Sequence, residues 1–301
     1  MYTPKKLQKG DVISLVAPAK AIEKQFIDHA TKYWEEKGFR VKVGAHCLGR
    51  SNYFSGTDVE RAGDLQVAID DPEVRAIICA RGGYGCVRII DHVNWAALLN
   101  DPKWLIGFSD VTYFHHHLAT LNIPSIHATM PLNYKENTPQ SLDSLTTVLA
   151  SNAVQYDWES GTSFSKDGSA NGTLIGGNLA VISAMIGTDL LPSYENKILF
   201  IEDVGEHLYA IDRMFYQLSK SGVLNRISGL IVGGFSNTKD TDTPFGVSLE
   251  ELITAHFKFR NIPIAFNFPA GHQEDNRALI FGMPTEFNVT TGTASLIINN
   301  G

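Results

Sequence analysis

Three polar side chains of complementary chemistry stand at the ends of apolar, strand-like runs. Ser109 ends the first of these runs, Glu202 ends the second, and His272 follows the third. Because reactive groups gather at the carboxyl ends of strands in an open α/β sheet, we expect the three side chains to meet. A hydroxyl, an imidazole and a carboxylate are the nucleophile, base and orienting acid of serine hydrolases. The pattern therefore predicts a hydrolytic centre with Ser109 as its nucleophile.

The segment around Ser109 predicts a sharp turn from a strand into a helix. Such a turn exposes the serine hydroxyl and directs backbone N–H groups and the helix N-terminus at the substrate oxygen. Gly107 is the small residue that this turn needs before the serine, but Val111 stands where a second small residue is usual. A helix N-cap without catalytic function is the alternative interpretation of Ser109.

A glycine-rich loop, residues 81–85, follows another buried strand-like run. Glycine permits backbone conformations that bring N–H groups close to a ligand, and we expect Gly83 to donate one N–H to an oxyanion hole. The spacing matches neither the dinucleotide-binding nor the Walker phosphate pattern, and a plain tight turn is the alternative. Arg81 is the closest cation and our candidate for binding a substrate carboxylate, ahead of Arg277.

The carboxylate and histidine candidates also have simpler interpretations. Glu202 opens an acidic segment, residues 202–206, whose charge would favour the start of a helix. His272 lies in a polar turn, where a histidine can titrate near neutral pH. The consecutive histidines 115–117 would point in different directions on a helix and do not suit one metal ion. Since the chain has no His-Glu-x-x-His motif, we expect neither a metal nor an organic cofactor.

Composition excludes several classes of function. The 301 residues include 25 basic and 32 acidic side chains, a formal net charge of −7, which argues against a nucleic-acid partner. The sequence contains neither a secretory signal nor an apolar run of the roughly 18 residues that a membrane span needs. We therefore expect a cytoplasmic protein that does not bind membranes. Three cysteines without metal-ligand spacing fit reduced thiols.

The first half of the chain alternates strand-like and helix-like segments. Such alternation predicts a parallel sheet covered by helices on both faces, and we expect this α/β domain to span residues 1–150. Residues 151–171 are rich in Ser, Asn, Asp and Gly and are predicted to be a linker. Residues 172–301 add further alternation and three final strands, which predicts a mixed α/β domain. Ser109 thus belongs to the first domain, and the other two candidates belong to the second.

Six motifs occur together in one order along the chain. They are Gly-Asp-Val-Ile-Ser-Leu-Val-Ala-Pro-Ala (10–19), Ala-Arg-Gly-Gly-Tyr-Gly (80–85), Ile-Gly-Phe-Ser-Asp-Val-Thr (106–112), Ile-Gly-Gly-Asn-Leu (175–179), Glu-Asp-Val-Gly-Glu (202–206) and Pro-Ala-Gly-His (269–272). Over nearly its whole length, the chain resembles the LD-carboxypeptidase family, which comprises the muramoyltetrapeptide carboxypeptidases and their microcin-immunity relatives.

The resemblance implies a fold, a site and an activity. It implies an N-terminal domain similar to class I glutamine amidotransferases, a C-terminal mixed domain, and a homodimer. It implies that Ser109 is the nucleophile, that His272 is the general base oriented by Glu202, and that the N–H groups of Gly83 and Asp110 form the oxyanion hole. The implied reaction is release of terminal D-alanine from murein tetrapeptides in peptidoglycan recycling, without a cofactor.

Two other functions stay open at the level of sequence. A serine peptidase of the microcin-immunity type would apply the same chemistry to a peptidyl-nucleotide, although those proteins tend to be longer. A non-catalytic binding protein with two lobes around a cleft would need none of this chemistry. The sequence does not distinguish lysine from diaminopimelate in the substrate, and it does not identify the dimer surface.

Overall fold

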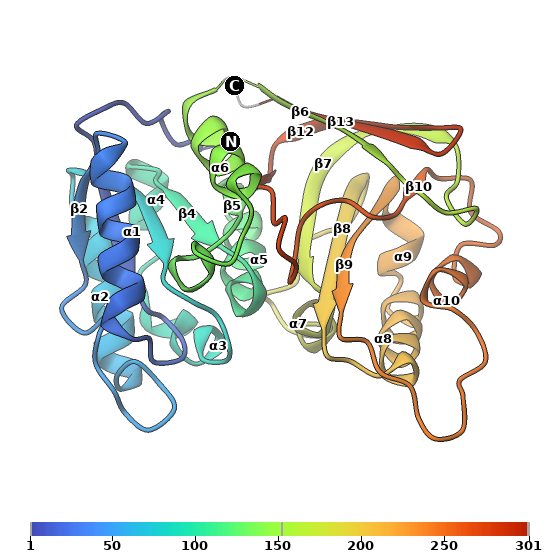
Figure 1. Ribbon diagram of the computed structural model, residues 1–301, viewed down its shortest axis with the longest axis horizontal. Coiled ribbons are helices and arrows are strands. Elements are labelled where there is room, and N and C mark those ends of the chain that lie inside the picture. The colour runs from blue at the N-terminus through green and yellow to red at the C-terminus, as the bar shows by residue number, and fades with distance from the viewer. Residues whose placement is uncertain (1, 152, 300–301) are drawn as a thin grey trace.

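Two β-sheets with flanking helices build the protein (Figure 1). The computed structural model describes residues 2–151 and 153–299. The first sheet has six strands and the second has seven. The prediction of a mixed α/β protein is therefore confirmed, whereas the resemblance to class I glutamine amidotransferases stays a prediction.

The first sheet belongs mainly to the N-terminal half of the chain. The elements of this half are β1 (Val12–Val16), α1 (Lys24–Glu36), β2 (Arg40–Val43), α2 (Asp58–Asp70), β3 (Val74–Cys79), α3 (Cys86–Ile89), α4 (Ala97–Asn100), β4 (Trp104–Gly107), α5 (Thr112–Thr120), β5 (Ser125–His127) and α6 (Pro139–Ala150). Strands β1 to β5 pair with one another in parallel. The helices pack on both faces of this sheet, which explains why β1 and β4 are buried throughout and apolar at every position except Ser14.

The edge strand of the first sheet comes from the far end of the chain. β11 (Leu279–Phe281) pairs antiparallel with β5, and the full order is β11-β5-β4-β3-β1-β2. We expected a parallel sheet built from residues 1–150 alone. The observed sheet has one additional strand from outside this range, the apolar β11, which covers the edge of β5. To reach β11, the segment 266–278 crosses from the second sheet to the first, and His272 lies on this crossing segment.

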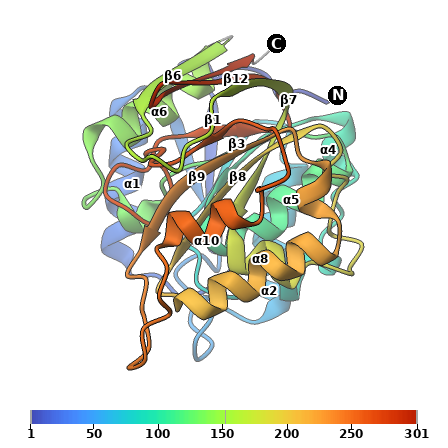
Figure 2. The same cartoon turned by 90° about the vertical axis from the view of Figure 1, so that its right-hand side faces the viewer.

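The second sheet combines parallel and antiparallel strands. Its elements, with their helices, are β6 (Ala153–Glu159), β7 (Gly168–Asn178), α7 (Leu179–Ala184), β8 (Lys197–Val204), α8 (Leu208–Lys220), α9 (Val223–Arg226), β9 (Gly229–Ser236), α10 (Leu249–Ala255), β10 (Ile264–Ala265), β12 (Pro284–Thr290) and β13 (Thr293–Asn299). The order is β10-β9-β8-β7-β12-β13-β6, with β7 to β10 parallel and the rest antiparallel. Figure 2 shows α8 and α10 lying across one face of this sheet. Within the described ranges, no helix is both long and apolar enough to cross a bilayer.

Much of the predicted linker, residues 151–171, is strand in the structure. β6 pairs with β13 at the edge of the second sheet, and β7 already begins at Gly168. β6 alternates exposed and buried residues, so its polar positions face solvent while Val154 and Tyr156 are buried. The exposed residues of β6 are mostly polar, and this composition is the reason why the sequence predicted a linker here. Residue 152 lies outside the described residues.

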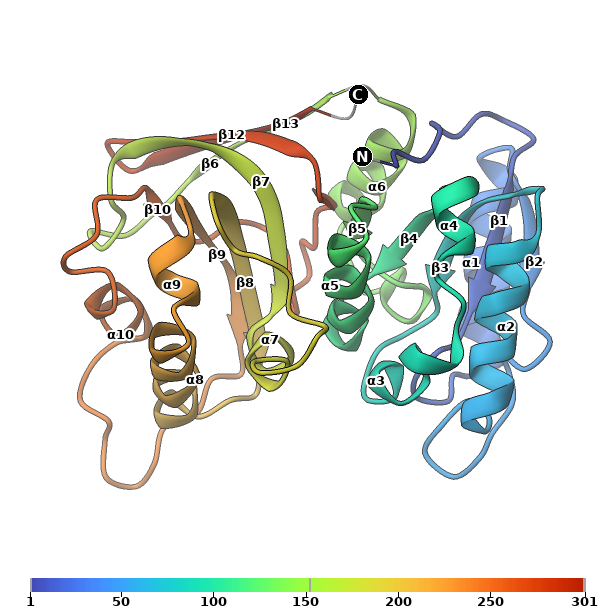
Figure 3. The same cartoon turned by 180° about the vertical axis from the view of Figure 1, so that it is seen from behind.

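The two sheets share one continuous apolar core. Ile126 of β5, Phe281 of β11 and Phe200 of β8 belong to the same buried cluster. The ring centroids of Phe200 and Phe281 are 6.3 Å apart. Seen from behind, α5 of the first half lies beside β7 of the second half at this boundary (Figure 3). A shared core of this kind holds the two halves in a fixed relation.

Candidate active site

Ser109 occupies the sharp turn between β4 and α5. Its φ angle is 64°, a left-handed conformation that costs a non-glycine residue about 1–2 kcal/mol. A short 3₁₀ helix, Ser109–Val111, leads into α5. A Cβ at Gly107 would come within 2.9 Å of Val111 Cγ2. The turn therefore accommodates Val111, where a small residue was expected, because Gly107 provides the space.

The glycine-rich loop passes directly beside Ser109. A Cβ at Gly82 would lie 3.0 Å from Ser109 Cβ and 3.3 Å from the Asp110 nitrogen. Gly83 has a φ of 112°, and its N–H donates to no residue that the structure describes. The Asp110 N–H belongs to the first helical turn, where N–H groups have no partner within the helix. Both predicted oxyanion donors thus belong to backbone that borders the Ser109 hydroxyl.

The Asp110 carboxylate ties the glycine loop to this turn. It accepts a hydrogen bond from the Cys86 N–H at 2.8 Å, and Asp110 is 3% exposed. Burial raises the pKa of Asp110, and the hydrogen bonds from Cys86 offset part of that rise. Our sequence interpretation assigned only the N–H of Asp110 and missed this side-chain contact, because Cys86 lies far from it in the chain.

Glu202 lies within β8 and not beyond the end of the strand. The strand continues to Val204, whereas the sequence pattern had placed its end before Glu202. The side chain of Glu202 is 0% exposed. Its Oε2 atom accepts hydrogen bonds from the backbone and the ring of His272, and its Oε1 atom is buried without a partner among the described residues. The carboxylate is therefore committed to His272.

His272 approaches Ser109 from the segment that crosses between the sheets. His272 lies in the turn that the polar sequence predicted, but the strand before it, β10, covers only Ile264–Ala265 and not the whole apolar run 263–271. Gly271 has a φ of 108°, and a Cβ there would lie 2.6 Å from Glu202 Cβ. Its N–H donates to Asn276 Oδ1 at 2.8 Å. The glycine thus lets the loop rest against Glu202 and places the next residue over Ser109.

Hydrogen bonds join the three side chains in one line. His272 Nε2 is 3.1 Å from Ser109 Oγ, and His272 Nδ1 is 2.6 Å from Glu202 Oε2. An ionised carboxylate only accepts hydrogen bonds, so Nδ1 carries the proton and Nε2 is left to accept from the serine hydroxyl. The structure therefore brings together the three residues that the sequence singled out, in the order that a nucleophile, a base and an orienting acid would need.

The environment of His272 favours its protonated form. Burial by itself would lower the pKa of His272, but the charge and hydrogen bond of Glu202, together with the charge of Asp203, raise that pKa above its ordinary value of 6.5. The ring of Phe108 packs against the imidazole, with centroids 4.9 Å apart. The imidazole is thus a strong base that is held in one orientation.

The two candidate cations for a substrate carboxylate differ in availability. Arg81 Nη1 donates to the Ala21 carbonyl at 3.1 Å, and Arg81 Nε is buried without a partner among the described residues. Burial lowers the pKa of Arg81, while Tyr53 opposes that shift. Arg277, in contrast, forms an ion pair with Asp275 at 2.9 Å. Arg81 has free donor capacity beside the glycine loop, and Arg277 is engaged elsewhere.

A second network, which sequence reasoning missed, joins the two halves beside the site. The Asn178 N–H donates to Thr112 Oγ1 at 3.1 Å, and Asn178 Nδ2 donates to Asp203 Oδ1 at 3.0 Å. Asp203 also accepts from the Ala180 N–H, and burial raises its pKa to about 6. A Cβ at Gly177 would lie 2.4 Å from Thr112 Oγ1. The Ile-Gly-Gly-Asn motif is therefore the point where β7 contacts the start of α5.

The buried histidines of α5 form hydrogen bonds within the fold. His115 contacts Ser125 Oγ and the Gly107 carbonyl, while His116 contacts the Thr112 carbonyl and the Tyr194 hydroxyl. Burial lowers the pKa of His115 to about 4. The three cysteines are buried and unpaired. In the part of the chain that the structure describes, no group of three or more His, Cys, Asp or Glu residues could hold a metal ion.

Sequence comparison identifies the family to which this site belongs. Residues 13–128 match the LD-carboxypeptidase N-terminal domain, and residues 171–287 match the LD-carboxypeptidase C-terminal domain. A carboxypeptidase homologue from Synechocystis sp. is 34% identical over 98% of this chain and 97% of its own length. The chain belongs to the LD-carboxypeptidase family. It is a hydrolase of the serine carboxypeptidase type, which removes the alternative of a non-catalytic binding protein.

Named relatives and solved structures agree with this assignment. The murein tetrapeptide carboxypeptidase of Pseudomonas aeruginosa is 30% identical, over 90% of this LD-carboxypeptidase and 91% of the relative. The muramoyltetrapeptide carboxypeptidase from Oxalobacter formigenes has a TM-score of 0.88 at 27% identity, covering 96% of this chain and 98% of its own. The protein MccF in complex with glutamyl sulfamoyl guanosine also has a TM-score of 0.88, at 20% identity over 99% and 98% of the two chains. The last likeness shows the fold alone.

Proposed function

We propose that this LD-carboxypeptidase releases terminal D-alanine from murein tetrapeptides in the cytoplasm, as a step of peptidoglycan recycling. The observation that carries the proposal is the hydrogen-bonded line from Ser109 through His272 to the buried Glu202. The names of the relatives from Pseudomonas aeruginosa and Oxalobacter formigenes support a murein peptide as the substrate. Neither a metal nor an organic cofactor is needed for this chemistry.

In the proposed mechanism, His272 Nε2 takes the proton of Ser109 as Oγ attacks the carbonyl carbon before the terminal D-alanine. Glu202 stabilises the resulting imidazolium through Nδ1. The N–H groups of Gly83 and Asp110 stabilise the oxyanion, and one such donor contributes about 3 kcal/mol to the transition state. His272 then protonates the leaving amine, D-alanine departs, and water activated by His272 hydrolyses the acyl-enzyme.

Arg81 is the proposed partner of the substrate's terminal carboxylate. Lys20 borders the same loop, because a Cβ at Gly83 would lie 3.2 Å from Lys20 Cβ, and its ammonium lies 5.1 Å from the ring centre of Tyr53. Neither cation forms an ion pair with an acidic residue in the described ranges. Two cations without acidic partners beside the nucleophile suit a substrate that ends in a carboxylate.

Release of D-alanine from defined tetrapeptides tests the proposal directly. Lysine-containing and diaminopimelate-containing tetrapeptides should be compared side by side, with the matching tripeptide as product standard. Ser109→Ala should lower the rate about a millionfold, since the nucleophile of a triad is lost. Turnover by Ser109→Ala near the wild-type rate would exclude the serine mechanism, and wild-type enzyme without activity on either tetrapeptide would exclude the substrate.

A peptidyl-nucleotide substrate of the microcin type is the second candidate. The fold likeness to MccF favours including it, because the same serine chemistry would serve both substrates. The two are separated by measuring kcat/KM for a tetrapeptide and for an aminoacyl sulfamoyl nucleoside on the same preparation. We also propose a homodimer, as the family resemblance implies, and sedimentation equilibrium would give a monomer mass if this is wrong.

A further inference from the structure

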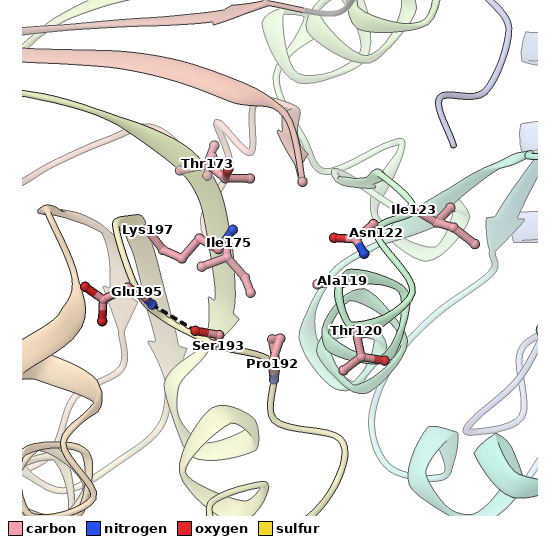
Figure 4. Close-up of a pocket in the computed structure, with 12 residues that line it drawn as sticks. Ala119, Thr120, Asn122, Ile123, Thr173, Ile175, Pro192, Ser193, Glu195 and Lys197 are labelled. Carbon is pink, nitrogen blue, oxygen red and sulfur yellow. Dashed lines mark hydrogen bonds between the residues drawn. The ribbon is translucent and has the colours of Figure 1, made fainter. Parts of the chain in front are cut away.

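A second cavity lies at the boundary of the two sheets, away from the triad. Its volume is about 560 Å³, within the range of roughly 300–1,000 Å³ that is usual for small-molecule sites. One wall is the end of α5 with the turn that follows it, including Ala119, Asn122 and Ile123. The opposite wall consists of β7 residues and the start of β8. Figure 4 shows these two walls facing each other across the cavity.

The separation from the triad follows from the elements that line the cavity. α5 begins at Thr112, just after Ser109, and reaches the cavity at Thr120, which at ~1.5 Å per residue corresponds to about 12 Å. β8 begins at Lys197 in the cavity and carries Glu202, about 16 Å further on at ~3.3 Å per residue. The cavity is therefore a distinct site at the opposite ends of the elements that position the triad.

Lys197 is the one cation among the residues that line this cavity. Its ammonium group forms no hydrogen bond or ion pair with any residue between positions 2 and 299 that the structure describes. Partial burial lowers the pKa of Lys197, and no acidic group offsets that effect. A cation that loses water without gaining a partner is destabilised, and an anion bound beside it would compensate.

The other lining residues favour a small anion with an apolar body. Figure 4 shows the Lys197 ammonium beside Ile175 and the side chain of Asn122 on the other wall with its oxygen toward the cavity, while the Glu195 carboxylate turns away. The accessible apolar lining comes from Ala119 and Pro192, which are partly buried, while Leu174, Ile175 and Ile123 lie almost fully buried beneath the surface. At the end of α5, the carbonyl groups of Leu118 and Ala119 already accept hydrogen bonds from backbone N–H groups. The polar group that this wall offers to a ligand is therefore the side-chain amide of Asn122. With one cation and one carboxylate in the lining, a polyanion is disfavoured.

We propose that this cavity is a second ligand site, which binds a small aliphatic monocarboxylate through Lys197 with its apolar part against Ala119 and Pro192. The side chain of Asn122 is exposed, and a rotation of its amide group would turn the NH₂ group toward the same carboxylate. This site goes beyond the proposed carboxypeptidase function and does not depend on it. Because the ligand would contact both halves of the chain, its binding would stabilise the folded protein.

Binding of butyrate is the direct test, with butyramide as the matched neutral ligand. In full-length protein with ¹³C-labelled lysine, butyrate should shift the ε-methylene resonance of Lys197, and butyramide should not. Lys197→Met should weaken butyrate binding about tenfold or more, since a charge-assisted hydrogen bond is lost. Lys258→Met, which removes an exposed lysine elsewhere, should leave the affinity unchanged. Inorganic phosphate should bind more weakly than butyrate.

Two further variants keep the proposal falsifiable. Ala119→Met fills the cavity from α5 without removing the charge, and it should also abolish butyrate binding if Lys197→Met fails to fold. Ser109→Ala and Arg81→Met should retain butyrate binding, because they alter only the triad region. Butyrate binding that survives both cavity variants, or that is lost in Arg81→Met, would overturn the proposal. Tighter binding of phosphate than of butyrate would overturn the assignment of a carboxylate.

Discussion

The imidazole of His272 determines how the activity should depend on pH. As a general base, His272 must be neutral in the free enzyme. Burial lowers the pKa of His272, but Glu202 and Asp203 raise it by more, so this pKa lies above 6.5. We therefore expect kcat/KM to fall as the pH is lowered through a midpoint above 6.5 and to level off at higher pH. Rates of D-alanine release between pH 5 and pH 9 measure this midpoint, and a midpoint well below 6.5 would contradict it.

Replacement of Glu202 by glutamine separates its charge from its shape. In Glu202→Gln the burial of His272 persists but the charge that raises its pKa is lost, so the midpoint of kcat/KM should move to lower pH. The rate on the plateau should fall about 10⁴-fold, because the amide no longer selects the productive tautomer. Glu251→Gln, at an exposed helix start, is the control and should change neither quantity. An unchanged midpoint in Glu202→Gln would show that the carboxylate does not tune the base.

At the scale of single residues, side-chain type and position predicted the triad but not its supports. Ser109, Glu202 and His272 carry chemistry that is visible in the sequence. The contacts of Asp110 with Cys86 and of Asn178 with Thr112 depend on segments that are distant in the chain. Such contacts form only when the backbone has folded, and Asp and Asn residues in loops are too common to indicate them.

At the scale of elements, the turn at Ser109, the loop of His272 and strand β8 position the site. The loop and the strand can approach closely because a glycine, Gly271, stands where they meet. In Gly271→Ala, the new Cβ would lie within 2.6 Å of Glu202 Cβ, so Glu202 or His272 must move. A displacement of about 1 Å can cost roughly 10²-fold in rate. We therefore expect Gly271→Ala to lower kcat/KM by that factor or more, as measured by D-alanine release.

Gly187→Ala is the matched control for this substitution. Gly187 also has a positive φ, 90°, but a Cβ there would meet nothing within 4 Å. Gly187→Ala should lose about 1–2 kcal/mol of unfolding free energy from backbone strain alone, and Gly271→Ala should lose more because its clash with Glu202 adds to the same strain. Only Gly271→Ala should lose activity. Equal activity in the two variants would show that the clash with Glu202 is relieved without moving the site.

The elements of the chain were predictable where their patterns were local. α2 spans Asp58–Asp70, as its pattern predicts, since its polar and apolar positions and its Thr57 cap are all close in sequence. The sequence did not predict that β6 is a strand or that β11 joins the first sheet, because short strands pair with segments that are distant in the chain. The turn that carries His272 was predictable from its polar composition, whereas its passage from the second sheet to the first depends on β11, which pairs with a distant segment.

At the scale of the whole molecule, the shared core links the two halves energetically. Phe281 lies in β11, which residues near the C-terminus contribute to the first sheet, and its side chain packs toward Phe200 of the second sheet. It is 1% exposed. The halves should therefore unfold together, and calorimetry of the wild-type protein should show one transition and not two.

Truncation of Phe281 tests this coupling. Phe281→Ala removes a buried ring that both sheets contact, so it should lower the unfolding free energy by about 3–5 kcal/mol while the transition stays single. Phe259→Ala removes a ring that is 95% exposed and should change stability by less than about 0.5 kcal/mol. If Phe281→Ala instead produced two separate transitions, the halves would be independently stable, and His272 would reach Ser109 through docking of two domains. Since the triad spans the boundary, activity would then be lost at the first transition.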